Sequence, residues 1–240
     1  MTRPNKSVIN LKIMSVKENL ENLQNRIKEA AQKVARNPDE IELVAVTKLV
    51  DINQIREAIN AGINIIGENR VQEAKSKFSQ LKTYDVKWHL VGHLQRNKVR
   101  DAIAIFDMIQ SVDRIELADE IDKRAGQVNK MIDILIQVNV SGEESKFGVS
   151  PSSTIGIIQQ IAKFKNIRIK GLMTIAPLVS KSEDVRPYFM ELAKLMDKIA
   201  RQKIENVQMK YLSMGMSNDF EVAIEEGSNM IRIGRAIFTV

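Results

Sequence analysis

The sequence has no cysteine among its 240 residues, and aromatic side chains make up only 5% of it. Without thiols it cannot form disulfide scaffolds, thiol nucleophiles or cysteine-ligated zinc sites, and it fits a reducing compartment. No apolar run approaches the roughly 20 residues that cross a bilayer, and the first residues lack the apolar segment of a secretory signal. We therefore expect a soluble, cytoplasmic protein with no membrane partner.

A block of like charges is also missing, although the formal net charge is +6. Lys and Arg alternate with Glu and Asp at helical spacing, which is typical of solvated helix faces. No basic cluster with interleaved aromatic residues occurs, so we expect no nucleic-acid partner. RNA binding by a basic barrel remains a weak alternative.

What the sequence does contain is a regular alternation of short β-branched segments with longer amphipathic ones. The pattern predicts eight strands, at residues 41–46, 63–67, 87–92, 106–111, 132–140, 168–174, 210–215 and 229–234. It predicts helices at about 7–36, 51–61, 68–81, 95–103, 113–126, 151–165, 181–203 and 217–226. One helix therefore precedes the first strand.

This order predicts an α/β protein, a single (βα)8 TIM-type barrel over residues 1–240, in which the N-terminal helix before strand 1 covers the seam. An open doubly wound sheet is the alternative. However, the turn after the first strand reads TKLVDIN and lacks the glycines of a dinucleotide fingerprint. No low-complexity linker divides the chain, so we expect one domain.

In a βα-barrel, ligand-binding groups lie where strands end at the C-terminal face. Alternation along the first strand places Val44, Val46 and Lys48 on one face, so Lys48 is expected to point into the barrel mouth. Partial burial there would lower the pKa of the lysine and free a neutral amine for Schiff-base formation. The simpler alternative is a packed stem whose ammonium reaches solvent.

The ends of the last two strands favour a ligand. SMGMSNDF follows the seventh strand and is predicted to open a helix at Ser217 or Asn218, while RIGRAIF places Gly234 after the eighth. Loops at these two positions form the recurrent phosphate site of this fold. Arg232 is expected to face inward with Met230, where its guanidinium needs an acceptor, either a carboxylate or a ligand nitrogen.

An amine, a phosphate site and an arginine together meet the requirements of pyridoxal 5′-phosphate (PLP). The chain also resembles the pyridoxal phosphate homeostasis protein family, fold-type III PLP-binding proteins whose barrel is like the N-terminal domain of alanine racemase. The resemblance covers nearly the whole length. It is carried by LVAVTK, GENRVQEA, KWHLVGHLQRNK, IQVNVSGEESKFGV, GLMTIAP and LSMGMSNDFEVAIEEGSNMIRIGRAIF.

The resemblance implies a role for nine residues. Lys48 would form the internal aldimine and Arg232 would face the pyridine nitrogen. Ser213, Ser217, Gly234 and Arg235 would surround the phosphate, the last two through backbone N–H groups. Asn69 and His89 match positions near the ring, and Met214 would shape the loop after the seventh strand. Arg70 departs from the family, which usually has Tyr after GEN.

Two other motifs are not expected to bind a metal or to catalyse a reaction. HLVGH places His89 and His93 four residues apart, but on a strand this spacing is roughly 13 Å, so we expect no metal site. SGEESKFG, residues 141–148, is expected to be a surface turn, and the resemblance implies that it overhangs the cofactor as a lid.

Two functions remain, a PLP-dependent amino-acid racemase and a carrier. Racemisation needs a base on each side of the substrate, and the opposing base is expected from a further β domain that the sequence does not predict. A permanently charged arginine also weakens the cofactor as an electron sink. We expect a monomeric, non-catalytic carrier for PLP and amino-acid homeostasis, with PLP-dependent apo-enzymes as recipients.

Overall fold

The computed structural model describes residues 15–239, which form a closed barrel of parallel strands in sequence order. β8 pairs with β1 to complete the ring, with Val44 opposite Arg232. The strands are β1 (Glu42–Val46), β2 (Ile65–Glu68), β3 (Lys87–Leu90), β4 (Met108–Val112), β5 (Ile132–Gln137), β6 (Ile167–Met173), β7 (Val207–Ser213) and β8 (Met230–Ile233). The predicted barrel is confirmed.

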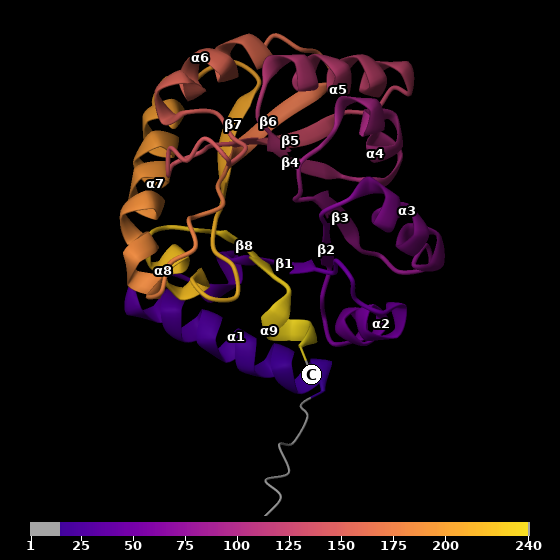
Figure 1. The fold of residues 1–240 in the computed structure, drawn as a ribbon, viewed down its shortest axis with the longest axis vertical. Helices are drawn as coiled ribbons and strands as arrows, with labels where there is room; N and C mark the ends of the chain where they lie inside the picture. Colours follow the sequence, from indigo (N-terminus) through magenta and orange to yellow (C-terminus); the bar gives the residue numbers. More distant parts are fainter. Residues whose placement is uncertain (1–14, 240) are drawn as a thin grey trace, which may run out of the picture.

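Helices cover the outside of this ring, as Figure 1 shows. They are α1 (Val16–Lys33), α2 (Ile52–Asn60), α3 (Val71–Gln80), α4 (Val99–Ile105), α5 (Ile115–Gln127), α6 (Pro151–Ile161), α7 (Arg186–Ala200), α8 (Phe220–Glu225) and α9 (Arg235–Phe238). Short 3-10 turns lie at Pro38–Glu40 (η1), Arg96–Lys98 (η2) and Ser182–Val185 (η3). Each parallel strand pair therefore has a covered crossover, as this fold requires.

α1 begins with a capping box. Ser15 Oγ accepts from the Glu18 N–H at 3.2 Å, and the Glu18 carboxylate accepts from the Ser15 N–H at 2.9 Å. These bonds satisfy two backbone donors that a helix start leaves free. Buried apolar residues then recur at helical spacing: Val16, Leu20, Leu23 and Ile27. Burying such a side chain contributes about 1.5–3 kcal/mol each.

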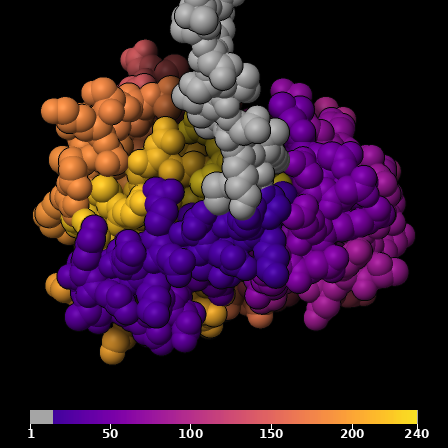
Figure 2. Space-filling model, turned by 90° about the horizontal axis from the view of Figure 1, so that it is seen from below, coloured from indigo at the N-terminus to yellow at the C-terminus, as the bar shows by residue number. Residues whose placement is uncertain are grey.

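The buried face of α1 covers the seam where β8 meets β1. Its leucines pack with Phe220 and Ile224 of α8 and with Ile237 of α9. Asn19 Nδ2 donates to the Ile237 carbonyl at 3.0 Å. Figure 2 shows α1 in indigo lying against the yellow C-terminal segments. The sequence-based assignment of the N-terminal helix to the seam is confirmed.

The barrel interior changes from apolar to polar along its axis. Val44, Ile65, Met108, Leu135, Met173 and Met230 form an apolar cluster with Tyr211 at its edge. Two residues further along their strands than Met108, Tyr211 and Met230 lie Gln110, Ser213 and Arg232, all buried. Because side chains alternate along a strand, these polar groups face the same interior, nearer the C-terminal mouth.

Element boundaries differ from the prediction where local contacts decide them. The first helix was predicted over 7–36; residues 7–14 lie outside the described part, and α1 ends at Lys33, before Ala35 at φ 54°. The helix predicted over 181–203 is η3 followed by α7. α9 was not predicted, because a four-residue helix shows no periodicity. No helix within residues 15–239 is long and apolar enough to cross a membrane.

Candidate functional site

Lys48 lies in a tight turn directly after β1. The Thr47 carbonyl accepts from the Val50 N–H at 3.1 Å, so Lys48 and Leu49 occupy the two central positions. Leu49 has φ +60°, a left-handed conformation that is uncommon for a bulky side chain. The Lys48 side chain is exposed, so the expected partial burial is wrong. The strand ends at Val46, and alternation does not continue into a turn.

A buried ion pair holds this turn from outside the barrel. Lys77 of α3 donates to the Thr47 carbonyl at 2.5 Å and to Glu68 Oε1 at 2.8 Å. The Thr47 hydroxyl donates to the same carboxylate oxygen at 2.5 Å. Glu68 is fully buried, and its Oε2 accepts no hydrogen bond from any described residue. The backbone before Lys48 is therefore anchored by charge-assisted bonds.

Arg232 faces the barrel interior, as predicted, and is only 4% exposed. Its two terminal nitrogens donate to Ser213 Oγ at 2.7 Å and to the Thr174 carbonyl at 2.6 Å. Burial lowers the pKa of Arg232 to about 10, opposed by the charge of Asp219. The guanidinium is thus charged at neutral pH, although both of its partners are neutral. This arrangement leaves it able to bind a further acceptor.

Ser213 connects Arg232 to two residues on the other side of the barrel. Its hydroxyl donates to Gln110 Oε1 at 2.7 Å, and Gln110 Nε2 lies 3.0 Å from His89 Nδ1. The sequence assigned Ser213 to a phosphate, which accepts hydrogen bonds. In this structure the Ser213 hydroxyl donates to Gln110 and accepts from Arg232, and the phosphate contact implied by the resemblance stays a prediction.

His89 is buried inside the barrel near its polar end. Burial, with a smaller effect of the nearby Lys87 charge, lowers the pKa of His89 to about 3, so its imidazole is neutral at neutral pH. Gln110 was missed by sequence reasoning, because it lies one residue before the end of the strand predicted over 106–111. The available signal was the spacing of two from Met108 within an apolar strand.

The loops after β7 and β8 meet, as predicted for a phosphate site. Ser217 Oγ accepts from the Ala236 N–H at 3.3 Å. The N–H of Arg235, the first residue of α9, makes no hydrogen bond to any described residue. A Cβ on Gly234 would lie 3.0 Å from the Val46 carbonyl oxygen, so the glycine permits a close approach to β1. These loops therefore lie beside the Lys48 turn.

The helix after β7 begins later than predicted. It starts at Phe220 with Asp219 as its N-cap, not at Ser217 or Asn218. Asp219 Oδ1 accepts from the Met216 N–H at 2.6 Å. This bond closes a turn over residues 216–219, and the helix begins only after that turn. Burial raises the pKa of Asp219.

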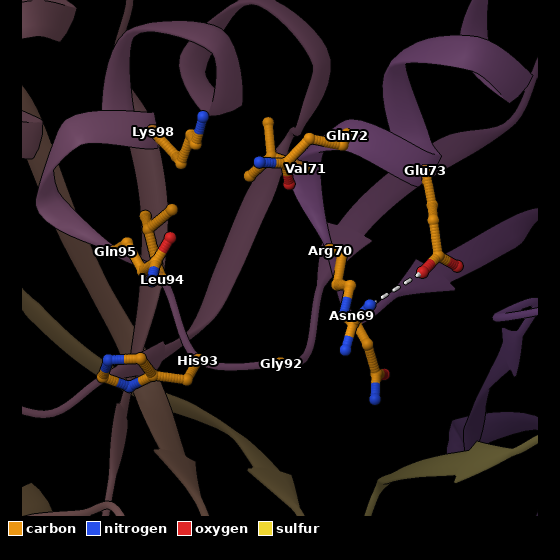
Figure 3. Close-up of a pocket in the computed structure, with 10 residues that line it drawn as sticks. All are labelled: Asn69, Arg70, Val71, Gln72, Glu73, Gly92, His93, Leu94, Gln95 and Lys98. Atoms are coloured by element: carbon orange, nitrogen blue, oxygen red, sulfur yellow. Dashed lines mark ion pairs between the residues drawn. The ribbon is translucent and has the colours of Figure 1, made fainter.

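Met214 and Asn69 lie apart from the interior polar group. The Met214 side chain is buried in the core between strands and helices, so only its backbone could contact a ligand. Asn69 is half-buried just past β2 and lines a cavity of about 630 Å³ beside the barrel mouth. Figure 3 shows this cavity between Asn69 and Arg70 on one side and His93 on the other.

His93 contacts a different part of the molecule from His89. Its ring stacks on Phe147 of the 141–148 loop at a centroid distance of 3.8 Å, and its Nδ1 lies 3.5 Å from Asp113. In the described range 15–239, no three His, Asp or Glu side chains gather as a metal site. The stack ties the 141–148 loop to the loop after β3.

Comparison with known proteins gives consistent matches over this barrel. The family model described as the N-terminal domain of alanine racemase matches residues 19–240. A relative named pyridoxal phosphate homeostasis protein, from Aquifex aeolicus (strain VF5), is 44% identical and is aligned over 94% of this chain and 98% of its own length.

Solved structures show the same architecture. PipY of Synechococcus elongatus PCC7942, solved with PLP bound, is 33% identical, with a TM-score of 0.82 over 93% of this chain and all of PipY. An alanine racemase of Clostridium difficile 630, solved with cycloserine, has a TM-score of 0.69 at 16% identity. It aligns over 92% of this chain and 59% of the racemase, a level of identity at which the likeness shows the fold alone.

Proposed function

Because the chain belongs to the pyridoxal phosphate homeostasis protein family and matches the family model of the alanine racemase N-terminal domain, we propose that it binds PLP at the barrel mouth. The protein would hold PLP for vitamin B6 and amino-acid homeostasis in the cytoplasm. The observation that carries this proposal is the buried Arg232, a cation whose partners are neutral and which can bind one more acceptor.

The residues present fit PLP at three points. Lys48 offers an exposed amine, with no hydrogen bond or ion pair to any described residue, at which PLP would be attached. Arg232 would donate to the pyridine nitrogen. The Arg235 N–H, the Gly234 backbone and Ser217 would hold the phosphate where the loops after β7 and β8 meet.

Asn69 and His89 are proposed to lie near the ring, and Met214 to contribute through the loop backbone. Ser213 is proposed to support Arg232, and its contact with the phosphate stays a prediction. Bound PLP supplies an electron-withdrawing ring next to an amine. Arg232, with a pKa of about 10, stays protonated and donates to the ring nitrogen without protonating it, which weakens that electron withdrawal.

We propose that the protein is a carrier without strong catalysis of its own. A racemase needs a second proton acceptor facing Lys48. His89, a titratable group among the proposed ring contacts, has a pKa of about 3 and is a poor proton acceptor at neutral pH. Racemisation is the second candidate, and the likeness to alanine racemase supports it only at the level of fold.

An absorbance scan tests the cofactor. Protein loaded with PLP should show a visible band that is lost in Lys48→Ala. The matched control is Lys82→Ala, which removes an exposed lysine from the loop between α3 and β3, at the opposite end of the barrel. A visible band that persists in Lys48→Ala, or that is lost equally in Lys82→Ala, would exclude attachment at Lys48.

Two assays then separate carrier from racemase. Incubation with L-amino acids in D2O should yield no D-isomer at enzymatic rates. Mixing the loaded protein with a PLP-dependent apo-enzyme should restore that enzyme's activity while the visible band of the carrier decreases. Rapid D-isomer formation would favour the racemase. We also propose a monomer, which light scattering would contradict if it gave twice the chain mass of 27.2 kDa.

A further inference from the structure

Four buried side chains form one hydrogen-bonded chain across the barrel interior. Arg232 and Ser213 come from β8 and β7, and Gln110 and His89 come from β4 and β3. Each is at most 4% exposed. Because unpaired polar groups are costly at such burial, the donors and acceptors along this chain have to match.

The chemistry of Arg232 fixes the direction of the first bond, and the directions of the others follow from the orientation of the Gln110 amide. Arginine has only donors, so Ser213 Oγ must accept from Arg232 and is free to donate to Gln110 Oε1. This places the amide nitrogen of Gln110 next to His89 Nδ1, which must therefore accept. The single N–H of the neutral His89 ring is then on Nε2.

Met230 removes the alternative orientation of the Gln110 amide. Its sulfur lies 3.2 Å from Gln110 Nε2 and is an acceptor only. A flipped amide would place an oxygen against that sulfur. Both N–H groups of Gln110 are thus used, one by His89 and one by Met230, while its oxygen accepts from Ser213.

We propose that Gln110 is a positioning residue that aligns Arg232 through Ser213 and fixes His89 in the Nε2–H tautomer. Its effect on PLP binding rests on the proposed function, because a misaligned Arg232 would donate less well to the pyridine nitrogen. Its effect on His89 does not depend on any ligand. The two effects can therefore be measured separately.

The first experiment observes the histidine rings of the ligand-free protein at pH 7 by 15N NMR. The sequence has only two histidines, so His93→Gln assigns both patterns. Wild type should show an unprotonated Nδ1 and a protonated Nε2 for His89. Gln110→Met, nearly equal in size, should shift the His89 Nδ1 resonance because its hydrogen bond is lost.

Gln137→Met is the matched control. Gln137 is also a buried glutamine, on β5, but its Nε2 donates to the Phe147 carbonyl at 3.0 Å, outside this chain of bonds. It should leave the His89 pattern unchanged. A protonated Nδ1 in wild type, or an unchanged Nδ1 resonance in Gln110→Met, would overturn the proposal.

The second experiment measures the dissociation constant of PLP by its visible band. Gln110→Met should keep the band, since Lys48 is intact, but raise the dissociation constant about tenfold, as expected for one hydrogen bond to a charged network. For affinity the control is Gln159→Met, which replaces an exposed glutamine on α6, outside the barrel, and should change the dissociation constant less than twofold. Equal affinities of the two variants would contradict the positioning role. A wild-type protein without any band would instead refute PLP binding, and the NMR result would stand.

Discussion

Lys48 lies in the turn after β1 and Arg232 lies in the neighbouring strand β8. The protein fixes the backbone before Lys48, whereas at Arg232 it fixes the side chain. The Lys48 turn is held by Lys77 and Glu68 outside the barrel, while its own amine is exposed and has no partner among the described residues. Arg232 is buried and held by two neutral acceptors inside the barrel. This difference fits the proposed function, in which the Lys48 amine would have to move to attach and release a cofactor, while Arg232 would only orient it.

The two regions also differ in how much stability the protein loses when a charged side chain is removed. A buried ion pair contributes little net stability, but removing one partner leaves an uncompensated charge. Among the described residues, Arg232 makes no ion pair within hydrogen-bonding distance. Its removal would unpair two neutral groups, Ser213 Oγ and the Thr174 carbonyl, and would take a favourable positive charge away from the more distant Asp219. Stability should therefore depend more on the support of Lys48 than on Arg232.

The largest expected effect is that of Lys77→Met. The Glu68 carboxylate would remain buried without its cation, so the free energy of unfolding should fall by about 3–5 kcal/mol in urea denaturation. Arg232→Met should cost less, about 1–3 kcal/mol, because the hydrogen-bond partners that it unpairs, Ser213 and the Thr174 carbonyl, are neutral and Asp219 lies beyond hydrogen-bonding distance. The comparison fails if the two losses are equal. Adding Glu68→Gln to Lys77→Met should recover most of the loss.

The pH dependence of stability tests the buried polar chain around Arg232, because His89 belongs to it. The pKa of His89 is about 3 in the folded protein and about 6.5 when exposed, so the unfolded chain takes up the proton first. This group therefore lowers stability as the pH falls from 6.5 towards 3, by about 1.4 kcal/mol per pH unit, or about 2 kcal/mol at pH 5. His89→Gln should remove this slope between pH 6.5 and 5. His93→Gln should retain it, and equal slopes in both variants would rule out His89 as its source.

The smallest expected effect tests the turn beside Lys48. Leu49 is 90% exposed and left-handed, so Leu49→Asn, which tolerates that conformation, should stabilise the protein by about 0.5–1 kcal/mol. Leu178, a loop leucine that is 95% exposed and lacks positive φ, provides the control. Leu178→Asn should change the unfolding free energy by less. A matching gain in both variants would mean that exposure rather than backbone strain causes it.

Much of the barrel was readable from the sequence because alternation and turn residues are local. The eight strands, the seam helix and the inward direction of Arg232 follow from that pattern. The exposure of Lys48 did not follow, because a turn interrupts the alternation that was extended into it. The pairing of Lys77 with Thr47 joins residues 30 apart and leaves no periodic signal.

Gln110 shows a second reason why an interior residue was not predicted from the sequence. The register of β4 with β5 shifts between Ile109 and Val112, and the strand runs one residue past its predicted end. The predicted strand ends at Ser111, whose hydroxyl donates to the Gly92 carbonyl. Gln110, which faces the barrel interior, precedes Ser111 by one residue. A shift of one position exchanges the two faces of a strand, so small register errors hide interior residues.

The helix over the seam also sets the order in which the molecule can be completed during synthesis. α1 packs on α8 and α9, and Asn19 bonds to a carbonyl 218 residues later. The apolar face of α1 therefore stays uncovered until α8 and α9 have been synthesised. During that time the intervening strands emerge and chaperones can bind this face. The β7 and β8 loops reach the Lys48 turn only after β8 has left the ribosome, so the proposed cofactor site cannot form before then.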